Sequence, residues 1–323
     1  MNRRALLRTA ALAPFAMVWS ASGEAAWPDR VIRIIVPFVP GAFTDVSARL
    51  VAQELSDHLG QPVIVENRGG AGGTIGTLEV VRSAPDGYTL LLTDTSLAIA
   101  PGLYPKLGYD VIRDLTQISR IAECPSILLV RPGLGPRTVA DLVEYGKKNP
   151  GKLTFGSGGV GSSAHLAMEL FLDVAGITAV HVPFRGVATA ITETVAGHID
   201  MTISSIAAGL GQVKGGTLLG LAVSGAQRST LLPDVPTFIE VGLPRYDMVY
   251  WWGIAAPARI SAELVTRLNR EVVRACDQPR LKNAFLQQAA VASTSTPDEM
   301  ASQLKREVAL WHDIITRAHV SIE

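Results

Sequence analysis

The chain has 323 residues, of which 48% are hydrophobic and 18% are charged. This composition excludes a disordered or fibrous protein, and the length allows two domains of ordinary size. The 29 basic and 29 acidic residues cancel to a formal net charge of zero. No long basic run is present to neutralise a phosphate backbone, so nucleic acid is not an expected partner.

Residues 1–26 are predicted to be a signal peptide. Arg3, Arg4 and Arg8 form a positive segment, the apolar run Ala10–Trp19 follows it, and small residues end the stretch. The apolar run is too short to cross a bilayer, which indicates export rather than anchoring. We therefore expect a periplasmic protein, and both a twin-arginine and a general secretory signal fit the pattern.

The first motif of the mature chain is a turn between a strand and a helix, residues 37–45. The unbroken apolar run Val31–Val36 predicts a buried parallel strand before it, and apolar residues at helical spacing from Val46 to Leu55 predict a helix after it. Thr44 or Asp45 stands where a helix N-cap belongs. Such a turn directs backbone N–H groups and the positive end of the helix dipole outward, which favours an anion. An ordinary strand-to-helix loop is the alternative.

Strand and helix patterns alternate along the rest of the chain and predict an α/β fold. One loop, Thr93–Ser96, follows a strand at the sheet edge where α/β proteins bind ligands. The predicted strands are Pro62–Val65, Tyr88–Leu92, Lys152–Phe155, Thr178–Val182, Ile199–Ser204 and Leu218–Val223. The predicted helices are Ile75–Arg82, Val139–Lys147, His165–Val174, Ala188–Ala196, Leu264–Cys276 and Pro297–Ala318.

Two further apolar segments, Ile118–Val130 and Met248–Ala256, are predicted to connect two lobes. Two crossings mean that the chain leaves one lobe and later returns to it, which suits a hinge with a cleft between the lobes. We assign residues 27–125 and 250–323 to lobe 1 and residues 126–249 to lobe 2.

A second glycine-rich turn, Gly156–Ser163, follows a predicted strand and opens a helix. Its Gly156-x-Gly158-x-x-Gly161 spacing matches a dinucleotide fingerprint, but the acid that should end the next strand is missing, since Pro183 stands there. An exported NADP-dependent oxidoreductase remains an alternative, which cofactor absorbance of the purified protein would decide. The main interpretation is an anion-binding turn, in which Ser162 and Ser163 offer hydroxyl and N–H groups.

Signals for catalysis and for metal binding are weak. No Gly-x-Ser-x-Gly elbow is present, and neither Cys-x-x-Cys nor His-x-x-x-His spacing occurs, so we expect no enzyme, metal or cofactor. His165 with Glu169, and His181, fit helix and core packing better than metal binding. The two cysteines are interpreted as separate buried thiols, with one disulfide as the alternative. Trp251 and Trp252 could stack on a ligand or pack in the hinge.

Several motifs together resemble the Bug family of periplasmic solute-binding receptors, which serve tripartite tricarboxylate transporters. They occur in family order through almost the entire mature chain. The resembling segments are Pro37–Asp45, Val65–Arg68, Pro85–Leu90, Tyr109–Asp110, His181–Gly186 and Leu232–Thr237.

The resemblance implies a type II periplasmic-binding fold, in which two α/β lobes close on a small carboxylate ligand. Main-chain N–H groups and waters would grip the carboxylate, with Asp45 acting as cap and water-holder. Apart from the resemblance, Arg185 is the one basic residue at the mouth of lobe 2, and both a functional charge and a solvated loop residue fit it. The expected partner is a membrane transporter, with a membrane sensor kinase as the alternative; neighbouring genes would separate the two. Nothing requires an oligomer, so a monomer is expected. The implied ligand-binding residues are Phe38, Gly41, Ala42, Thr44 and Asp45 in lobe 1 and Ser157, Gly161, Ser162 and Ser163 in lobe 2, with Thr95, Ser96, Ser204 and Ser205 as ligand-discriminating contacts.

The chain departs from the family pattern at Ala42, where the family usually has a second glycine, and at Val187, where it usually has a small polar residue. Ala42 still supplies an N–H group but narrows the conformational freedom of the turn. Val187 removes a hydroxyl near the mouth of lobe 2. We therefore expect a mono- or dicarboxylate in preference to a tricarboxylate.

Overall fold

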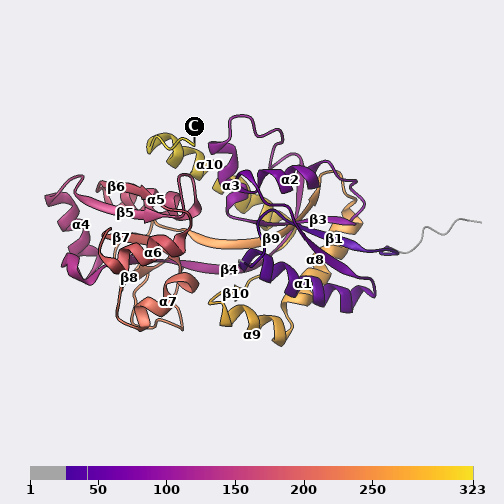
Figure 1. Cartoon of the computed structure of the whole chain (residues 1–323). Helices are drawn as coiled ribbons and strands as arrows, with labels where there is room; N and C mark the ends of the chain where they lie inside the picture. Colours follow the sequence, from indigo (N-terminus) through magenta and orange to yellow (C-terminus); the bar gives the residue numbers. More distant parts are fainter. Residues whose placement is uncertain (1–26, 42, 323) are drawn as a thin grey trace, which may run out of the picture.

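The computed structural model describes residues 27–41 and 43–322. The predicted signal peptide and Ala42 lie outside these residues. The described chain forms two α/β bodies (Figure 1). We call the body around β1, β2 and β3 lobe 1 and the body around β5, β6, β7 and β8 lobe 2.

Lobe 1 is built on a sheet whose first three strands are parallel. β1 (Ile32–Val36) lies between β2 (Val63–Asn67) and β3 (Thr89–Asp94), and all its residues except Arg33 are buried. The short β10 (Val291–Ala292) pairs with the outer side of the sheet, on β4. The predicted strands of this half of the chain are confirmed.

Lobe 2 repeats the arrangement with its own strands. β5 (Leu153–Ser157) runs parallel to β6 (Ala179–Pro183) and to β7 (Met201–Ser205). β8 (Leu219–Val223) pairs with β4. These strands also confirm the sequence predictions.

Two long strands join the lobes. β4 (Leu115–Val130) pairs with β9 (Val249–Pro257) from Leu115 to Pro125, and from Ser126 onward it pairs with β7. β9 in turn pairs with β3. One strand thus belongs to the sheets of both lobes, and Figure 1 shows β4 and β9 running between the two bodies.

Helices flank both sheets (Figure 1). In lobe 1, α10 packs against α3 and β4, and α8 packs against α1 and β4, so the C-terminal helices return to this lobe as predicted. α10 also contacts α5 of lobe 2. The lobe 1 helices are α1 (Phe43–Leu59), α2 (Thr74–Val81), α3 (Ser96–Leu103), α8 (Ala262–Cys276), α9 (Pro279–Gln287) and α10 (Pro297–Arg317); those of lobe 2 are α4 (Val139–Lys148), α5 (Ser163–Ala175), α6 (Val187–Ala196) and α7 (Ile206–Lys214).

The structure corrects the sequence predictions at four helices, among them α9, which was not predicted. α1 begins at Phe43, so the N-cap prediction for Thr44 or Asp45 is wrong, and both lie in its first turn. α3 and α7 were not predicted, because Pro101 in α3 and glycines in α7 resemble loop residues. In α7 the glycine has a packing reason: a Cβ at Gly209 would lie 2.7 Å from the Leu129 side chain.

Cys124 and Cys276 are both buried and free, so the structure favours separate thiols. Within residues 27–41 and 43–322, no three His, Cys, Asp or Glu side chains are grouped so as to hold a metal ion. No helix of the same residues combines the length and apolarity needed to cross a membrane.

A buried ion pair fastens the strands of lobe 2. The Asp200 carboxylate accepts hydrogen bonds from the Arg131 guanidinium (2.7 and 2.9 Å) and from the N–H and hydroxyl of Thr154 (2.9 and 3.0 Å). We expect Asp200→Ala to lower the free energy of unfolding by about 2 kcal/mol or more. The change leaves the half-buried Arg131 guanidinium and the Thr154 N–H of β5 without their acceptor. Urea unfolding measures this, and Asp234→Ala, which removes an exposed carboxylate, is the control. Equal losses in both variants would contradict the prediction.

Candidate functional site

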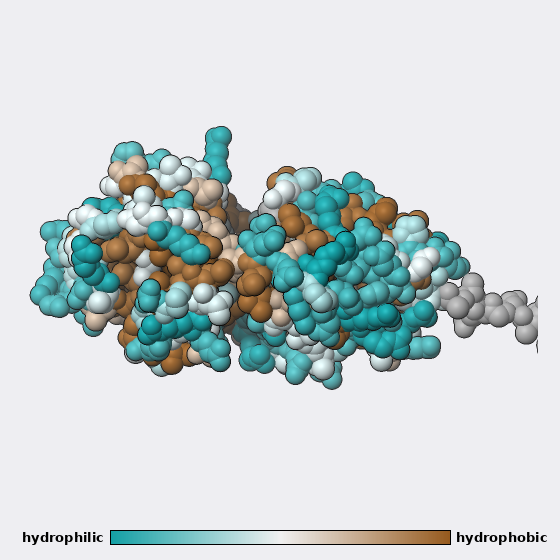
Figure 2. All heavy atoms as spheres, turned by 90° about the horizontal axis from the view of Figure 1, so that it is seen from below, coloured by the Kyte–Doolittle hydropathy of each residue, from teal (hydrophilic) through white to brown (hydrophobic). Residues whose placement is uncertain are grey.

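The candidate site is a cleft between the lobes that contains two cavities. The first cavity has a volume of about 410 Å³ and the second about 480 Å³. The space-filling view shows a hollow between the two bodies, bordered by hydrophobic residues (Figure 2). Both cavities are lined by Phe38, Ser162, Ser163, Tyr250 and Trp252.

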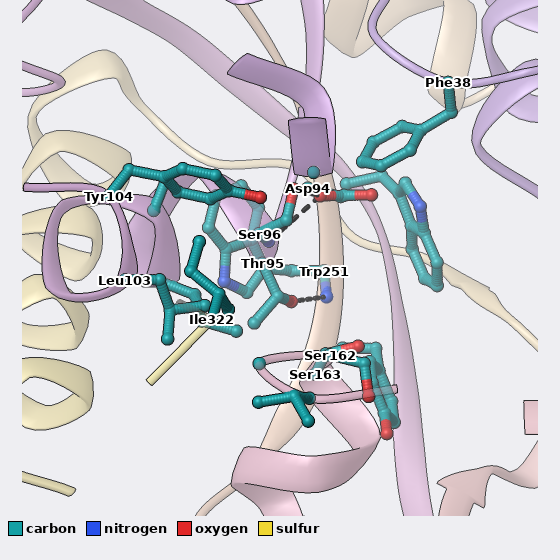
Figure 3. A pocket seen from close by; sticks show the side chains of 17 residues that line it. Phe38, Asp94, Thr95, Ser96, Leu103, Tyr104, Ser162, Ser163, Trp251 and Ile322 are labelled. Carbon is teal, nitrogen blue, oxygen red and sulfur yellow. Dashed lines mark hydrogen bonds between the residues drawn. The ribbon is translucent and has the colours of Figure 1, made fainter. Parts of the chain in front are cut away.

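The lining residues follow the carboxyl ends of the parallel strands. Phe38 follows β1 and Thr95 and Ser96 follow β3, whereas Ser162 and Ser163 follow β5. In Figure 3 the residues around Thr95 face the Ser162–Ser163 pair across the first cavity. This is where ligands bind in open α/β sheets.

The N-terminus of α5 directs unpaired donors into both cavities. Ser162 is the N-cap, and its Oγ accepts from the His165 N–H at 3.3 Å, while its own N–H donates to the Gly159 carbonyl at 3.1 Å. The N–H groups of Ser163 and Ala164 have no partner among the described residues. Since these two residues line the cleft, the N-terminus of α5 is a candidate anion-binding site.

The loop before α5 lies close to lobe 1. Gly161 has φ +73°, and a Cβ there would lie 2.5 Å from Leu103 and 3.3 Å from Ile322. These two residues line the first cavity beside Tyr104 (Figure 3). A glycine is therefore needed both for the backbone conformation and for the approach of the lobes.

A chain of hydrogen bonds ends on the carboxylate of Asp94, which lines the first cavity. The Trp252 indole N–H donates to Thr44 Oγ1 at 3.0 Å, and the Thr44 hydroxyl lies 3.4 Å from Asp94 Oδ2. The Ser96 N–H and hydroxyl both donate to Asp94 Oδ1. Burial raises the pKa of Asp94 above its ordinary value, although the donors from Ser96 and Thr44 act in the opposite direction.

Asp45, in contrast, is paired inside lobe 1 and lines neither cavity. Its carboxylate accepts from the Arg49 guanidinium (2.9 and 3.1 Å), from the Asn67 amide (2.9 Å) and from the Gly41 N–H (3.2 Å). Burial would raise the pKa of Asp45, but these bonds outweigh it and hold the pKa below the ordinary value. The Gly41 N–H is therefore already used within lobe 1.

Two stacked histidines support the glycine-rich turn from behind. The rings of His165 and His181 lie 3.7 Å apart, and His181 Nε2 is 2.7 Å from Ser157 Oγ. His165 Nδ1 accepts from the Gly161 N–H at 3.0 Å. Ser157 therefore holds the turn and does not line a cavity. Burial, together with repulsion from His165, lowers the pKa of His181 to about 4.

The remaining candidates fall into two groups. Ser204, Ser205 and Val187 line the second cavity. Arg185 is exposed and Thr44 is buried, and neither lines a cavity. The Thr44 hydroxyl contacts Asp94, which lines the first cavity. The candidates that the structure brings together are Phe38, Thr95, Ser96, Gly161, Ser162, Ser163, Ser204 and Ser205. Those that it sets apart are Gly41, Thr44, Asp45, Ser157 and Arg185; Ala42 is not described.

Several lining residues were missed by the sequence reasoning. Asp94 was available, because it ends β3 and belongs to the predicted loop Thr93–Ser96, but its neighbours Thr95 and Ser96 were chosen instead. Tyr250 belongs to a segment predicted only as a hinge. Ile322 could not be found, because nothing local indicates that the chain end reaches the cleft.

Comparison with solved structures places this architecture among periplasmic solute-binding proteins. MatC from Rhodopseudomonas palustris, solved with bound malate, is 30% identical with a TM-score of 0.75, and the match covers 90% of this chain and 100% of that one. An R. palustris protein solved with adipate is 31% identical with a TM-score of 0.78, covering 92% and 100%. The fold and cleft are those of a two-lobed solute-binding protein.

The sequence comparisons identify the family. Residues 47–319 match the tripartite tricarboxylate transporter family receptor. BugT of Bordetella pertussis is 36% identical over 291 residues, which cover 90% of this chain and 89% of that protein. The chain therefore belongs to the family of tripartite tricarboxylate transporter receptors, which are solute-binding proteins, and the resemblance to Bug receptors is confirmed.

The histidine pair predicts a dependence of stability on pH. Since the pKa of His181 is about 4 in the folded protein and 6.5 in an exposed histidine, the unfolded chain binds an extra proton between these values. The free energy of unfolding should therefore fall as the pH is lowered from about 6.5 to about 4.

Urea unfolding across this range measures the effect in wild type and in His181→Gln, which cannot titrate. The variant should lose part of the slope, whereas His198→Gln, at an exposed histidine, should keep it. An unchanged slope in His181→Gln would show that other groups cause the dependence.

Proposed function

We propose that the protein is a periplasmic receptor that captures a small carboxylate by closure of its lobes and presents it to a tripartite tricarboxylate-type transporter. Family membership and the solved relatives with malate and adipate support this proposal. The observation that carries it is the N-terminus of α5, whose two unpaired N–H groups face the cleft. Binding, rather than chemical conversion, is its activity.

The carboxylate is bound by backbone groups rather than by a basic side chain. The described lining of both cavities contains no Lys, Arg or His, and Arg185 lies outside it. Ser163 and Ala164 offer N–H groups at the positive end of the α5 dipole. The Thr95 hydroxyl, whose oxygen accepts from the Trp251 N–H, keeps its hydrogen for a further polar contact from lobe 1, whereas the Ser96 hydroxyl already donates to Asp94. These residues form the proposed carboxylate site.

The second cavity selects the chemical character of the part of the ligand that extends beyond the bound carboxylate. Phe43, Val187, Ala207 and Trp252 are among its apolar lining residues, and no charged residue lines it within the described chain. The two further carboxylates of a tricarboxylate would be desolvated there without a cation to pair with them. The ligand is therefore a mono- or dicarboxylate with an apolar portion.

Closure occurs about the two strands that join the lobes. We divide the lobes between Pro125 and Ser126 in β4, where the partner strand changes from β9 to β7, and at the start of β9 near Tyr250. Lobe 1 then comprises residues 27–125 and 250–323 and lobe 2 residues 126–249. An ion pair between Asp173 of α5 and Arg317 of α10 fastens the lobes on one side of the cleft. A monomer, exported under the direction of its first 26 residues, suffices for this mechanism.

Replacing Ser163 by proline tests the carboxylate site. Proline is well tolerated at the first position of a helix, and Ser162 already has the extended conformation (φ −64°, ψ 155°) that precedes proline. The change removes one N–H donor and should weaken carboxylate binding by roughly 10-fold or more, the value of a charge-assisted hydrogen bond.

Isothermal titration with malate and adipate measures this loss. Ser163→Ala, which keeps the N–H and loses the hydroxyl, is the matched control and should bind more tightly than Ser163→Pro. The diamides of both acids should bind more weakly than the acids. Equal affinity of acid and diamide would contradict the carboxylate site.

Closure itself is measured by small-angle X-ray scattering. A bound carboxylate gains contacts with both lobes only in the closed state, so it should shift the population toward that state and lower the radius of gyration. Ser163→Pro at the same ligand concentration should show a smaller change. A radius of gyration that stays constant at saturating ligand would contradict closure.

A further inference from the structure

Asp94 is the single charged side chain in the described lining of the two cavities. It lies at the carboxyl end of β3, and its side chain borders the first cavity (Figure 3). No described residue forms an ion pair with it. A partly buried carboxylate in a site that receives carboxylates is unfavourable unless something compensates it.

The donors around Asp94 stabilise the negative charge without neutralising it. Oδ1 accepts from the N–H and the hydroxyl of Ser96, whereas Oδ2 has only the long contact of 3.4 Å with the Thr44 hydroxyl. The lone pair of Thr44 Oγ1 already accepts from the Trp252 indole N–H, which directs the Thr44 hydrogen toward Asp94. Oδ2 therefore keeps the capacity to accept a strong donor.

No other residue of the first cavity can supply a positive charge. Besides Asp94, the ionisable groups of its described lining are the phenols of Tyr104 and Tyr250, which are uncharged at neutral pH. The cation must therefore come from the ligand.

We propose that Asp94 binds a protonated amino group of the ligand, so that the receptor recognises an amino acid zwitterion. This inference rests on the proposed function, because it places the ligand carboxylate on the N–H groups of Ser163 and Ala164. Figure 3 shows Asp94 and Ser96 on the lobe 1 side of the first cavity and Ser162 and Ser163 on the lobe 2 side, so the two charges of one zwitterion meet opposite lobes.

The environment of Asp94 supports a cationic partner over a hydroxyl. Burial raises the pKa of this carboxyl, which means that its negative form is under-stabilised in the unliganded protein. An ammonium group beside it relieves the cost in a site shielded from water, where charge–charge attraction is strong. A ligand with only carboxylates instead adds repulsion.

The test compares matched pairs of ligands that differ only in the amino group. The pairs are L-aspartate and succinate, L-glutamate and glutarate, L-leucine and 4-methylpentanoate, and L-phenylalanine and 3-phenylpropanoate, each titrated calorimetrically into the purified protein at pH 7.5. Within every pair that binds, the amino acid should bind at least about 10-fold more tightly, since only it pairs the Asp94 charge.

The variant Asp94→Asn keeps the shape of the side chain and removes its charge. It should weaken amino acid binding by about 30-fold or more. The affinity for the acid of each pair that lacks the amino group should stay equal or increase. Asp94→Ser serves as a second variant, and the melting temperature of each unliganded variant reports its folding. Asp234→Asn, at an exposed carboxylate, is the control and should leave the affinity for both ligands of a pair unchanged.

The outcomes separate this inference from the proposed function. If succinate, glutarate, adipate or malate binds and no amino acid binds more tightly than its partner, Asp94 does not recognise an amine and the carboxylate receptor stands. The same conclusion follows if Asp94→Asn weakens both members of a pair equally. If no carboxylate of any kind binds, both the inference and the proposed function are wrong.

Discussion

The antiparallel pairing of β4 with β9 is the constraint on which the site depends. Because β4 continues past Pro125 into the sheet of lobe 2, the two lobes share a strand and cannot be arranged independently. This shared strand turns the carboxyl ends of both sets of parallel strands toward one gap. Helix N-termini then converge there, and the sheet connectivity creates a cleft suited to anions.

Local signals were sufficient for most of the fold. The apolar run before Val36 and the glycine–serine turn before α5 each carry their pattern within about ten residues, so a strand and a helix start could be predicted there. α3 was missed because Pro101 argues against a helix, yet tertiary packing against α10 outweighs it. The α1 boundary was misplaced because Thr44 resembles a cap, although its hydroxyl in fact connects Trp252 to Asp94.

The candidate site was less predictable because the role of each acid is decided at long range. Arg49 stands four residues after Asp45, a spacing that indicates an ion pair on one helix face, so the neutralisation of Asp45 could have been found. Asn67, which completes its surroundings, is 22 residues away. Asp94 depends on Thr44, 50 residues earlier, and on the absence of a cation from the other described segments of the lining. No local pattern contains that absence.

The described lining of the two cavities contains no basic residue, and this has a consequence for recognition. A guanidinium in the cleft would by itself favour a ligand carboxylate beside it through a bidentate, charge-assisted pair. The backbone N–H groups of Ser163 and Ala164 can donate hydrogen bonds to one carboxylate of any ligand. The rest of the specificity is left to side chains. In this chain those side chains are one acid, Asp94, in the first cavity and apolar residues such as Val187 in the second. A ligand that is negative at one end, positive beside it and apolar beyond brings no unpaired charge into the closed cleft.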